Sequence, residues 1–376
     1  MTEQERHRRS DASAALPAEA LGAAPGPRSV LMKVLSAALS GGLLVLLFLV
    51  IIPALGDMSE VWDAITSMSV ATVVGLVIAA LVIRALLAAA YVPLIPGLSF
   101  VRSVIARESS SAVSNVIPGP SGTATQYVVL RSWGVSTERF AVATVSVSVI
   151  TDALLFAAPG VLLLLWVLLG QPAKQSSHQV WLIGVITLAV TAVTVTLVVA
   201  VARSERLAGL LGRVGQACVN PFRRLFRKDT FGNWPERAQG LRVDTLGLVR
   251  GNATVLACTI GGGYLLNGLL LVWCLWACGV DHAVMPMSLG LFVYSVGRAV
   301  TIVPITPGGV GVVELVYTAA YVAVLGEESH DAVLAGVLVY RALTYALPLV
   351  TGAIAYLAWR IMRVKEIHDV AAAAKP

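Results

Sequence analysis

The chain has 376 residues, of which 57% are hydrophobic and only 13% are charged, and its formal net charge is +6. Several uncharged runs reach the ~20 residues that a transmembrane helix needs, so the composition excludes a water-soluble globular domain. It predicts an all-α polytopic membrane protein.

The N-terminal residues 1–33 are polar and rich in Pro and Ala, and we expect a disordered cytoplasmic tail. The first apolar run, 34–55, is too long for a signal peptide and lacks a suitable small-residue cleavage site, so it should remain in the membrane. Five more full spans are expected near 70–94, 140–169, 180–202, 253–278 and 332–359. One transmembrane domain, 34–360, should therefore precede a cytoplasmic tail, 361–376.

Two further apolar stretches, 101–133 and 285–325, are interrupted centrally by "VIPGPSG" and "IVPITPGG". The prolines that break the helices are Pro118, Pro120, Pro304 and Pro307. Proline removes a backbone donor, and lipid cannot satisfy the polar backbone that such a break exposes, so the break must be buried in protein or line a wet cavity. We predict two re-entrant hairpins; two ordinary spans with a proline kink are the alternative.

The charges between the spans are strongly asymmetric. If both hairpins return to their own side, the inside segments hold 23 of the 27 Lys and Arg residues; these segments are 1–33, 95–139, 203–250 and 360–376. The outside segments contain Lys174 as their only basic residue, against seven acidic ones. The positive-inside rule then predicts that both termini lie in the cytoplasm. We expect the protein in the inner (cytoplasmic) membrane of the cell.

Five ionisable residues fall within predicted membrane segments: Arg84, Asp152, Arg298, Glu314 and Arg341. Each would cost ~2.5–3.5 kcal/mol at the bilayer centre on insertion scales, so each is a candidate for substrate binding. Simpler interpretations remain open. Arg84 can snorkel or form a structural ion pair, and Asp152 and Arg341 can form a purely structural pair.

The two halves of the chain show the same order of features. Repeat one, about 101–169, and repeat two, about 285–359, each contain a Pro/Gly break followed by a charged helix, and an offset of 189 aligns Asp152 with Arg341. Three full crossings separate the units, so the second copy should be inverted. Inverted repeats with broken helices are a transporter architecture, with the site at the repeat interface. We therefore expect Asp152 and Arg341 to face one cavity.

The glycines after the second break suggest an anion site. Gly308, Gly309 and Gly311 would expose backbone amides at the start of the returning half-helix, whose dipole favours a phosphate. Glu314 follows within that half-helix and can pair with an arginine or take a cationic headgroup. It can equally be a dipole partner that only stabilises the half-helix.

The stretch "VPITPGGVGVVE" (303–314), followed by "YRALTYALPLVTG" (340–352), resembles the signature of the lysylphosphatidylglycerol synthase transmembrane, or flippase-like, family. The resemblance covers roughly 34–360 and implies a lipid flippase region. The residues that match the motif are Pro304, Pro307, Gly308, Gly309, Gly311, Glu314, Arg341 and Pro348, and Tyr340 adjoins them as a candidate binding residue. The first half departs from the pattern, because Thr123, Ala124 and Gln126 provide no acidic counterpart to Glu314.

The resemblance also implies a limit on activity. Relatives carry a cytoplasmic aminoacyl-transferase domain, whereas only 16 residues follow Arg360 here, so we expect no aminoacylation of lipid and no enzyme activity. Walker-type loops and H-E-x-x-H helices are absent from the sequence, and the five histidines fall in tails or loops. Four cysteines lack paired spacing. No metal or cofactor is expected.

Two functions fit these features. The first is a translocator of an anionic phospholipid or lipid-linked precursor, whose phosphate is held by Arg341 and Arg298. The second is a non-catalytic scaffold or regulatory subunit for a separate lipid-modifying or glycosyl-transferring enzyme. The basic loop 203–250 suits an anionic membrane surface better than nucleic acid. The lipid, the energy source and the oligomeric state are left open.

Overall fold

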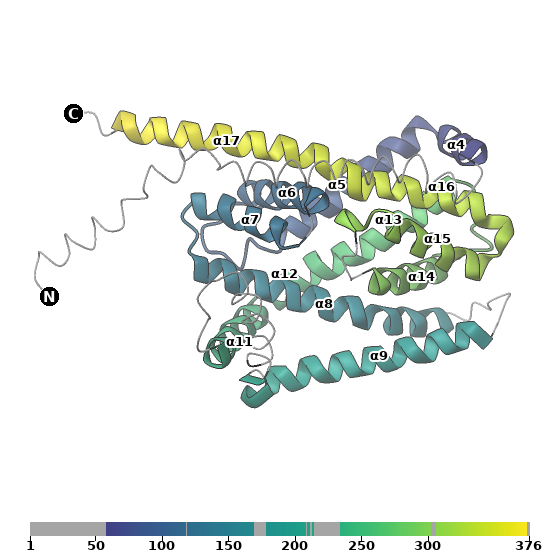
Figure 1. Ribbon diagram of the computed structural model, residues 1–376, viewed down its shortest axis with the longest axis horizontal. Coiled ribbons are helices and arrows are strands. Elements are labelled where there is room, and N and C mark those ends of the chain that lie inside the picture. Colours follow the sequence, from purple (N-terminus) through teal and green to yellow (C-terminus); the bar gives the residue numbers. More distant parts are fainter. Residues whose placement is uncertain are drawn as a thin grey trace, which may run out of the picture.

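The computed structural model describes residues 58–117, 119–168, 178–207, 209–210, 213, 234–301 and 306–373. Regular structure in these ranges is helical throughout, with no strand, which confirms the all-α prediction. Long helices run along the longest axis of the molecule, with shorter helices between them (Figure 1). The expected tail 1–33, the expected span 34–55, Pro118 and Pro304 lie outside the described residues.

Four helical segments are long and apolar enough to cross a membrane: Val70–Ala89, Thr137–Leu168, Ala253–Ala277 and Glu327–Val364. The first two are α5 and α8. The third comprises α12 (Ala253–Leu256), a π-helical turn η3 (Ala257–Gly261) and α13 (Gly262–Ala277). The fourth runs from η5 (Glu327–Ser329) through α16 (His330–Arg341), a second π turn η6 (Ala342–Ala346) and into α17 (Leu347–Ala373). All four correspond to predicted spans.

The remaining long helix, α9 (His178–Arg203), contains the shorter apolar segment Gly184–Val198 and packs along α8. Large apolar side chains of α8 and α9 face outward, among them Leu164, Leu165 and Val193. Such faces suit contact with lipid tails. Two helices occupy segments expected to be loops: α4 (Met58–Thr66), which packs on α16, and α11 (Trp234–Gly251), which packs on α8.

Each interrupted stretch forms a pair of packed helices and not one kinked helix. Hairpin 1 consists of α6 (Phe100–Val116) and α7 (Ser121–Ser132), joined by a tip in which Gly119 has a φ of 86°. Hairpin 2 consists of α14 (Met287–Val300) and α15 (Val312–Leu325), with one 3-10 turn, η4 (Pro307–Gly309), in its tip. The Pro/Gly breaks therefore end helices, as the sequence predicted.

The two hairpins pack in a crossed arrangement. The first helix of hairpin 1, α6, packs most extensively on α17, which follows hairpin 2. The first helix of hairpin 2, α14, packs on α8, which follows hairpin 1, and α5 packs on α13. The hairpins lie in opposite halves of the molecule along its long axis (Figure 1), and α6 meets η4 between them. One apolar core surrounds each hairpin, which leaves the tips at the boundary between the two cores.

Gly352 permits the close contact between α17 and α6. A Cβ atom added there would collide with the side chain of Ala112 and would lie 2.6 Å from the backbone oxygen of Glu108. Backbone cannot move aside cheaply, so we expect Gly352→Ala to lower the melting temperature of the detergent-purified protein. The overpacking cost of ~1–3 kcal/mol should exceed the ~1 kcal/mol gained in helix propensity. Gly247→Ala, in α11 with open space around it, should be neutral or stabilising; equal melting temperatures for the two variants would contradict this packing.

Candidate functional site

A cavity of about 640 Å³ lies between the two hairpin tips. Its wall includes residues of α5, α6, α8, α13, α14, α15 and α16, together with both tips and the two π turns. Four arginines line it, namely Arg84, Arg107, Arg298 and Arg341. None of the described Asp or Glu side chains is part of the lining. The cavity is therefore a basic chamber between apolar cores.

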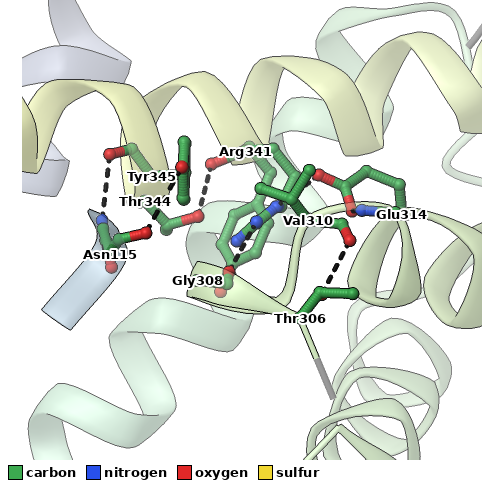
Figure 2. A network of polar contacts seen from close by, with 10 residues as sticks. Asn115, Thr306, Gly308, Val310, Glu314, Arg341, Thr344 and Tyr345 are labelled. Carbon is green, nitrogen blue, oxygen red and sulfur yellow. Dashed lines mark hydrogen bonds and ion pairs between the residues drawn. The ribbon is translucent and has the colours of Figure 1, made fainter. Parts of the chain in front are cut away.

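Arg341 is held against the tip of hairpin 2 (Figure 2). Its Nε donates a hydrogen bond of 2.8 Å to Oε1 of Glu314, and its Nη2 donates one of 2.9 Å to the Gly308 carbonyl. Its guanidinium carbon lies 5.1 Å from the ring centre of Tyr345. The other Glu314 oxygen accepts the Gly311 amide at 2.8 Å, and this glutamate is only 2% exposed. Glu314 therefore both caps α15 and orients Arg341.

Backbone geometry explains the glycines of this tip. Gly308, Gly309 and Gly311 have φ values of 60°, 71° and 82°, which L side chains rarely adopt. A Cβ atom on Gly308 would also collide with the ring of Tyr345. Because Glu314 already binds the Gly311 amide, that amide is not free for a phosphate. Of the three amides expected to bind an anion, that of Gly311 is thus taken by Glu314, and that of Gly309 donates to the Thr306 carbonyl.

The two tips are connected through η6. The Asn115 side chain, at the end of α6, donates a hydrogen bond of 3.1 Å to the Tyr345 carbonyl. The Tyr345 hydroxyl donates to the Asn115 carbonyl at 3.4 Å (Figure 2). The same ring lies against Gly308, where an added Cβ atom would collide with it, so Tyr345 contacts both hairpin tips.

A second buried ion pair lies beside the cavity. Both Nε and Nη2 of Arg84 donate to Oε2 of Glu108, at 2.8 and 2.6 Å. The Thr351 hydroxyl donates to the same oxygen. Glu108 is 5% exposed. This network joins α5, hairpin 1 and α17, so Arg84 forms the structural ion pair that the sequence left open.

The other two arginines have no protein counterion. The guanidinium groups of Arg107 and Arg298 form no hydrogen bond or ion pair with any residue in the described ranges. Arg298 lines the cavity together with Tyr264, Tyr294, Tyr317 and Tyr340. The rings of Tyr294 and Tyr317 are stacked with centres 6.0 Å apart. The chamber thus carries two positive charges that no described side chain balances.

A family model for the lysylphosphatidylglycerol synthase TM region matches residues 30–352. The chain belongs to this family. The match spans both hairpins and the cavity, and confirms the resemblance found in the motif. A search of curated proteins gave no match. Together with the apolar helices, the match shows a multi-pass membrane protein of the lysylphosphatidylglycerol synthase TM family.

Most of the predicted site residues of this family member meet at the cavity. The lining includes Arg84, Arg298, Gly308, Gly309, Tyr340 and Arg341. Gly311 and Glu314 lie directly behind Arg341 and hold the tip in place. Pro120 directly precedes α7, and Pro307 begins η4, so both stand at the helix breaks.

The predicted pairing of Asp152 with Arg341 is wrong. Arg341 pairs with Glu314, and Asp152 is exposed and forms no ion pair with the described residues. Its neighbour Thr151 lines the cavity in its place. One residue along an α-helix turns the side chain by about 100°, since a turn holds 3.6 residues. An alignment correct to within one residue therefore still directs the wrong side chain inward.

Sequence reasoning missed the polar residues of hairpin 1. Arg107, Glu108 and Asn115 fall in segment 95–139, which the charge count assigns to the inside, although the hairpin within it is predicted to enter the membrane. Charges within a re-entrant hairpin are membrane charges, and this signal could have identified Arg107 and Glu108. No three His, Cys, Asp or Glu side chains gather as a metal site in the part of the chain that the structure describes.

The Glu314 and Arg341 pair should be energetically coupled. Removing one partner of a buried ion pair typically costs ~3–5 kcal/mol because the other charge is left unpaired. We expect Glu314→Ala and Arg341→Ala each to lower the melting temperature, and the double variant to lose clearly less than the sum. Arg139→Ala, on an exposed side chain, is the control. Strictly additive losses would show that the pair does not act as a unit.

Proposed function

We propose that this protein is a lipid translocator that moves an anionic phospholipid or lipid-linked precursor between membrane leaflets. The observation that carries the proposal is the chamber between the hairpin tips, lined by four arginines and no described carboxylate, with Arg107 and Arg298 uncompensated. Positive charge at membrane depth is costly unless it is paired. A phosphate group would supply that partner, and guanidinium groups bind phosphate by charge-assisted, bidentate hydrogen bonds.

The crossed packing of the hairpins supports an alternating-access mechanism. Because α6 packs on α17 while α14 packs on α8, each hairpin rests on the span that follows the other. Inverted repeats related by a pseudo-twofold axis in the membrane plane would produce this arrangement. In the proposed cycle, the repeats rock about the chamber while the lipid tails stay in the bilayer. No chemical step on the lipid is proposed.

The proposed location is the cell membrane, with the N- and C-termini in the cytoplasm. The charge asymmetry of the connecting segments supports this orientation. Two exposed positions test it in a variant without the four native cysteines: Glu327, between α15 and α16, and Arg250, in α11.

An impermeant maleimide added to intact cells should label Glu327→Cys, because that connection is expected outside. Arg250→Cys should react only after the membrane is permeabilised. The two labelled fractions are compared by mass shift on a gel. Reversed labelling, or labelling of both variants from outside, would contradict the proposed topology.

Translocation is tested in liposomes that contain only this protein. A fluorescent phosphatidylglycerol placed in one leaflet should appear in the other, as measured by quenching with dithionite. We expect Arg298→Gln to slow the movement at least about tenfold, the effect of losing ~1.4 kcal/mol of binding. Since Arg298 has no described protein partner, its loss should leave the fold intact.

Arg139→Gln removes the same charge from an exposed position of α8 and should transport normally. Absence of movement of both phosphatidylglycerol and phosphatidic acid with the unmodified protein would reject translocation and favour an accessory subunit of a separate lipid-modifying enzyme. Normal movement with Arg298→Gln would reject the role of the chamber.

A further inference from the structure

The charge balance of the chamber indicates what kind of headgroup it accepts. Arg84 is neutralised by Glu108, and Arg341 by Glu314, through hydrogen bonds of 2.6–2.8 Å. Arg107 and Arg298 also line the chamber but have no counterion among the described residues. Two unit charges in the chamber are therefore available to a ligand, because no described side chain balances them.

Unsatisfied hydroxyl groups mark one contact point. Tyr264 and Tyr317 line the chamber beside Arg298, and their hydroxyls are buried without a hydrogen-bond partner in the described structure. Tyr317 is only 1% exposed. Buried polar groups normally have partners, so unpaired donors next to a guanidinium point to a missing acceptor. A phosphate oxygen accepts from both kinds of donor.

Arg107 provides a second contact point on the other hairpin. It extends from α6, whereas Arg298 belongs to α14, and both reach the same cavity. The cavity volume of about 640 Å³ lies within the range of roughly 300–1,000 Å³ for small-molecule sites. A headgroup with two negative charges can engage both hairpins at once. A phosphodiester, with one charge, would leave one arginine unbalanced.

We propose that the chamber selects lipids whose phosphate headgroup carries two or more negative charges, a phosphomonoester or a diphosphate, over singly charged phosphodiesters. A phosphomonoester carries about −1.5 to −2 charges at pH 7 because its second pKa is about 6. This inference rests on the proposed function only in that both use the same chamber. Binding, measured apart from transport, tests it.

The test compares short-chain lipids that share the same tails and bind to the detergent-purified full chain at pH 8. The phosphomonoester is dioctanoyl phosphatidic acid, the diphosphate is dioctanoylglycerol diphosphate, and the phosphodiester is dioctanoyl phosphatidylglycerol. We expect the first two to bind at least about tenfold more tightly than the third. Equal affinity for all three would overturn the proposal.

Substitutions of the two unpaired arginines test the mechanism. Arg107→Gln and Arg298→Gln should each reduce the preference to about twofold or less, while Arg139→Gln should retain it. Tyr264→Phe removes an unpaired hydroxyl, so it should keep or raise the melting temperature and yet weaken binding of the phosphomonoester several-fold. Unchanged preference in the folded arginine variants, or unchanged affinity in Tyr264→Phe, would contradict the assignment.

Inorganic phosphate and pyrophosphate distinguish a lipid from a free anion. They should compete only weakly, and competition as strong as that of the lipids would contradict a lipid ligand. Liposome transport separates the two proposals. If phosphatidylglycerol is bound and moved as well as phosphatidic acid, the selectivity is rejected and translocation stands. If phosphatidic acid is preferred but nothing moves, translocation is rejected and the selectivity stands.

Discussion

The structure of the second hairpin depends on hydrogen-bond partners for the backbone groups that its helix break leaves unpaired. Where α14 ends and α15 begins, backbone groups lose their helical partners, and lipid offers none. Two side chains supply replacements, because Arg341 binds the Gly308 carbonyl and Glu314 binds the Gly311 amide. Their mutual ion pair fixes both at once. Three glycines with positive φ allow the backbone to reach these partners.

The first hairpin uses the same chemistry in a different place. The pair between Arg84 and Glu108 does not cap the tip but joins α6 to α5 and, through Thr351, to α17. The two hairpins thus differ in the position of their arginine–glutamate pair. They are alike in that the first helix of each packs on the long helix that follows the other hairpin. Both glutamates, Glu108 and Glu314, already form ion pairs within the protein. Of the four arginines that line the chamber, only Arg107 and Arg298 have no partner among the described residues, which separates the charges that build the chamber from those that can meet a ligand.

The π turns contribute to the shape of the chamber. One follows Arg341 directly, and the residues Tyr340, Arg341, Leu343 and Thr344 all line the cavity. The other contains Ile260, which lies on the same wall. π segments are rare within α-helices, but those that occur often lie at functional sites. There they change which side chains face inward. Here they bring almost a full turn of polar and apolar groups onto one surface.

The sequence by itself determined the described membrane helices, the two breaks and the glycines of the second tip. These features are local, because hydropathy, proline and glycine act on their own segment of chain. It also identified the family through residues 303–314 and 340–352, which the match to 30–352 confirmed.

Only the tertiary structure decided the partners. Glu108 meets Thr351 across 243 residues, and Asn115 meets Tyr345 across 230. Thr151 lines the cavity and Asp152 does not, because successive side chains of α8 point in different directions around the helix axis. Such contacts depend on how each helix is rotated and how deeply it packs. Those quantities follow from the side chains of neighbouring helices, which the local pattern along one segment does not contain.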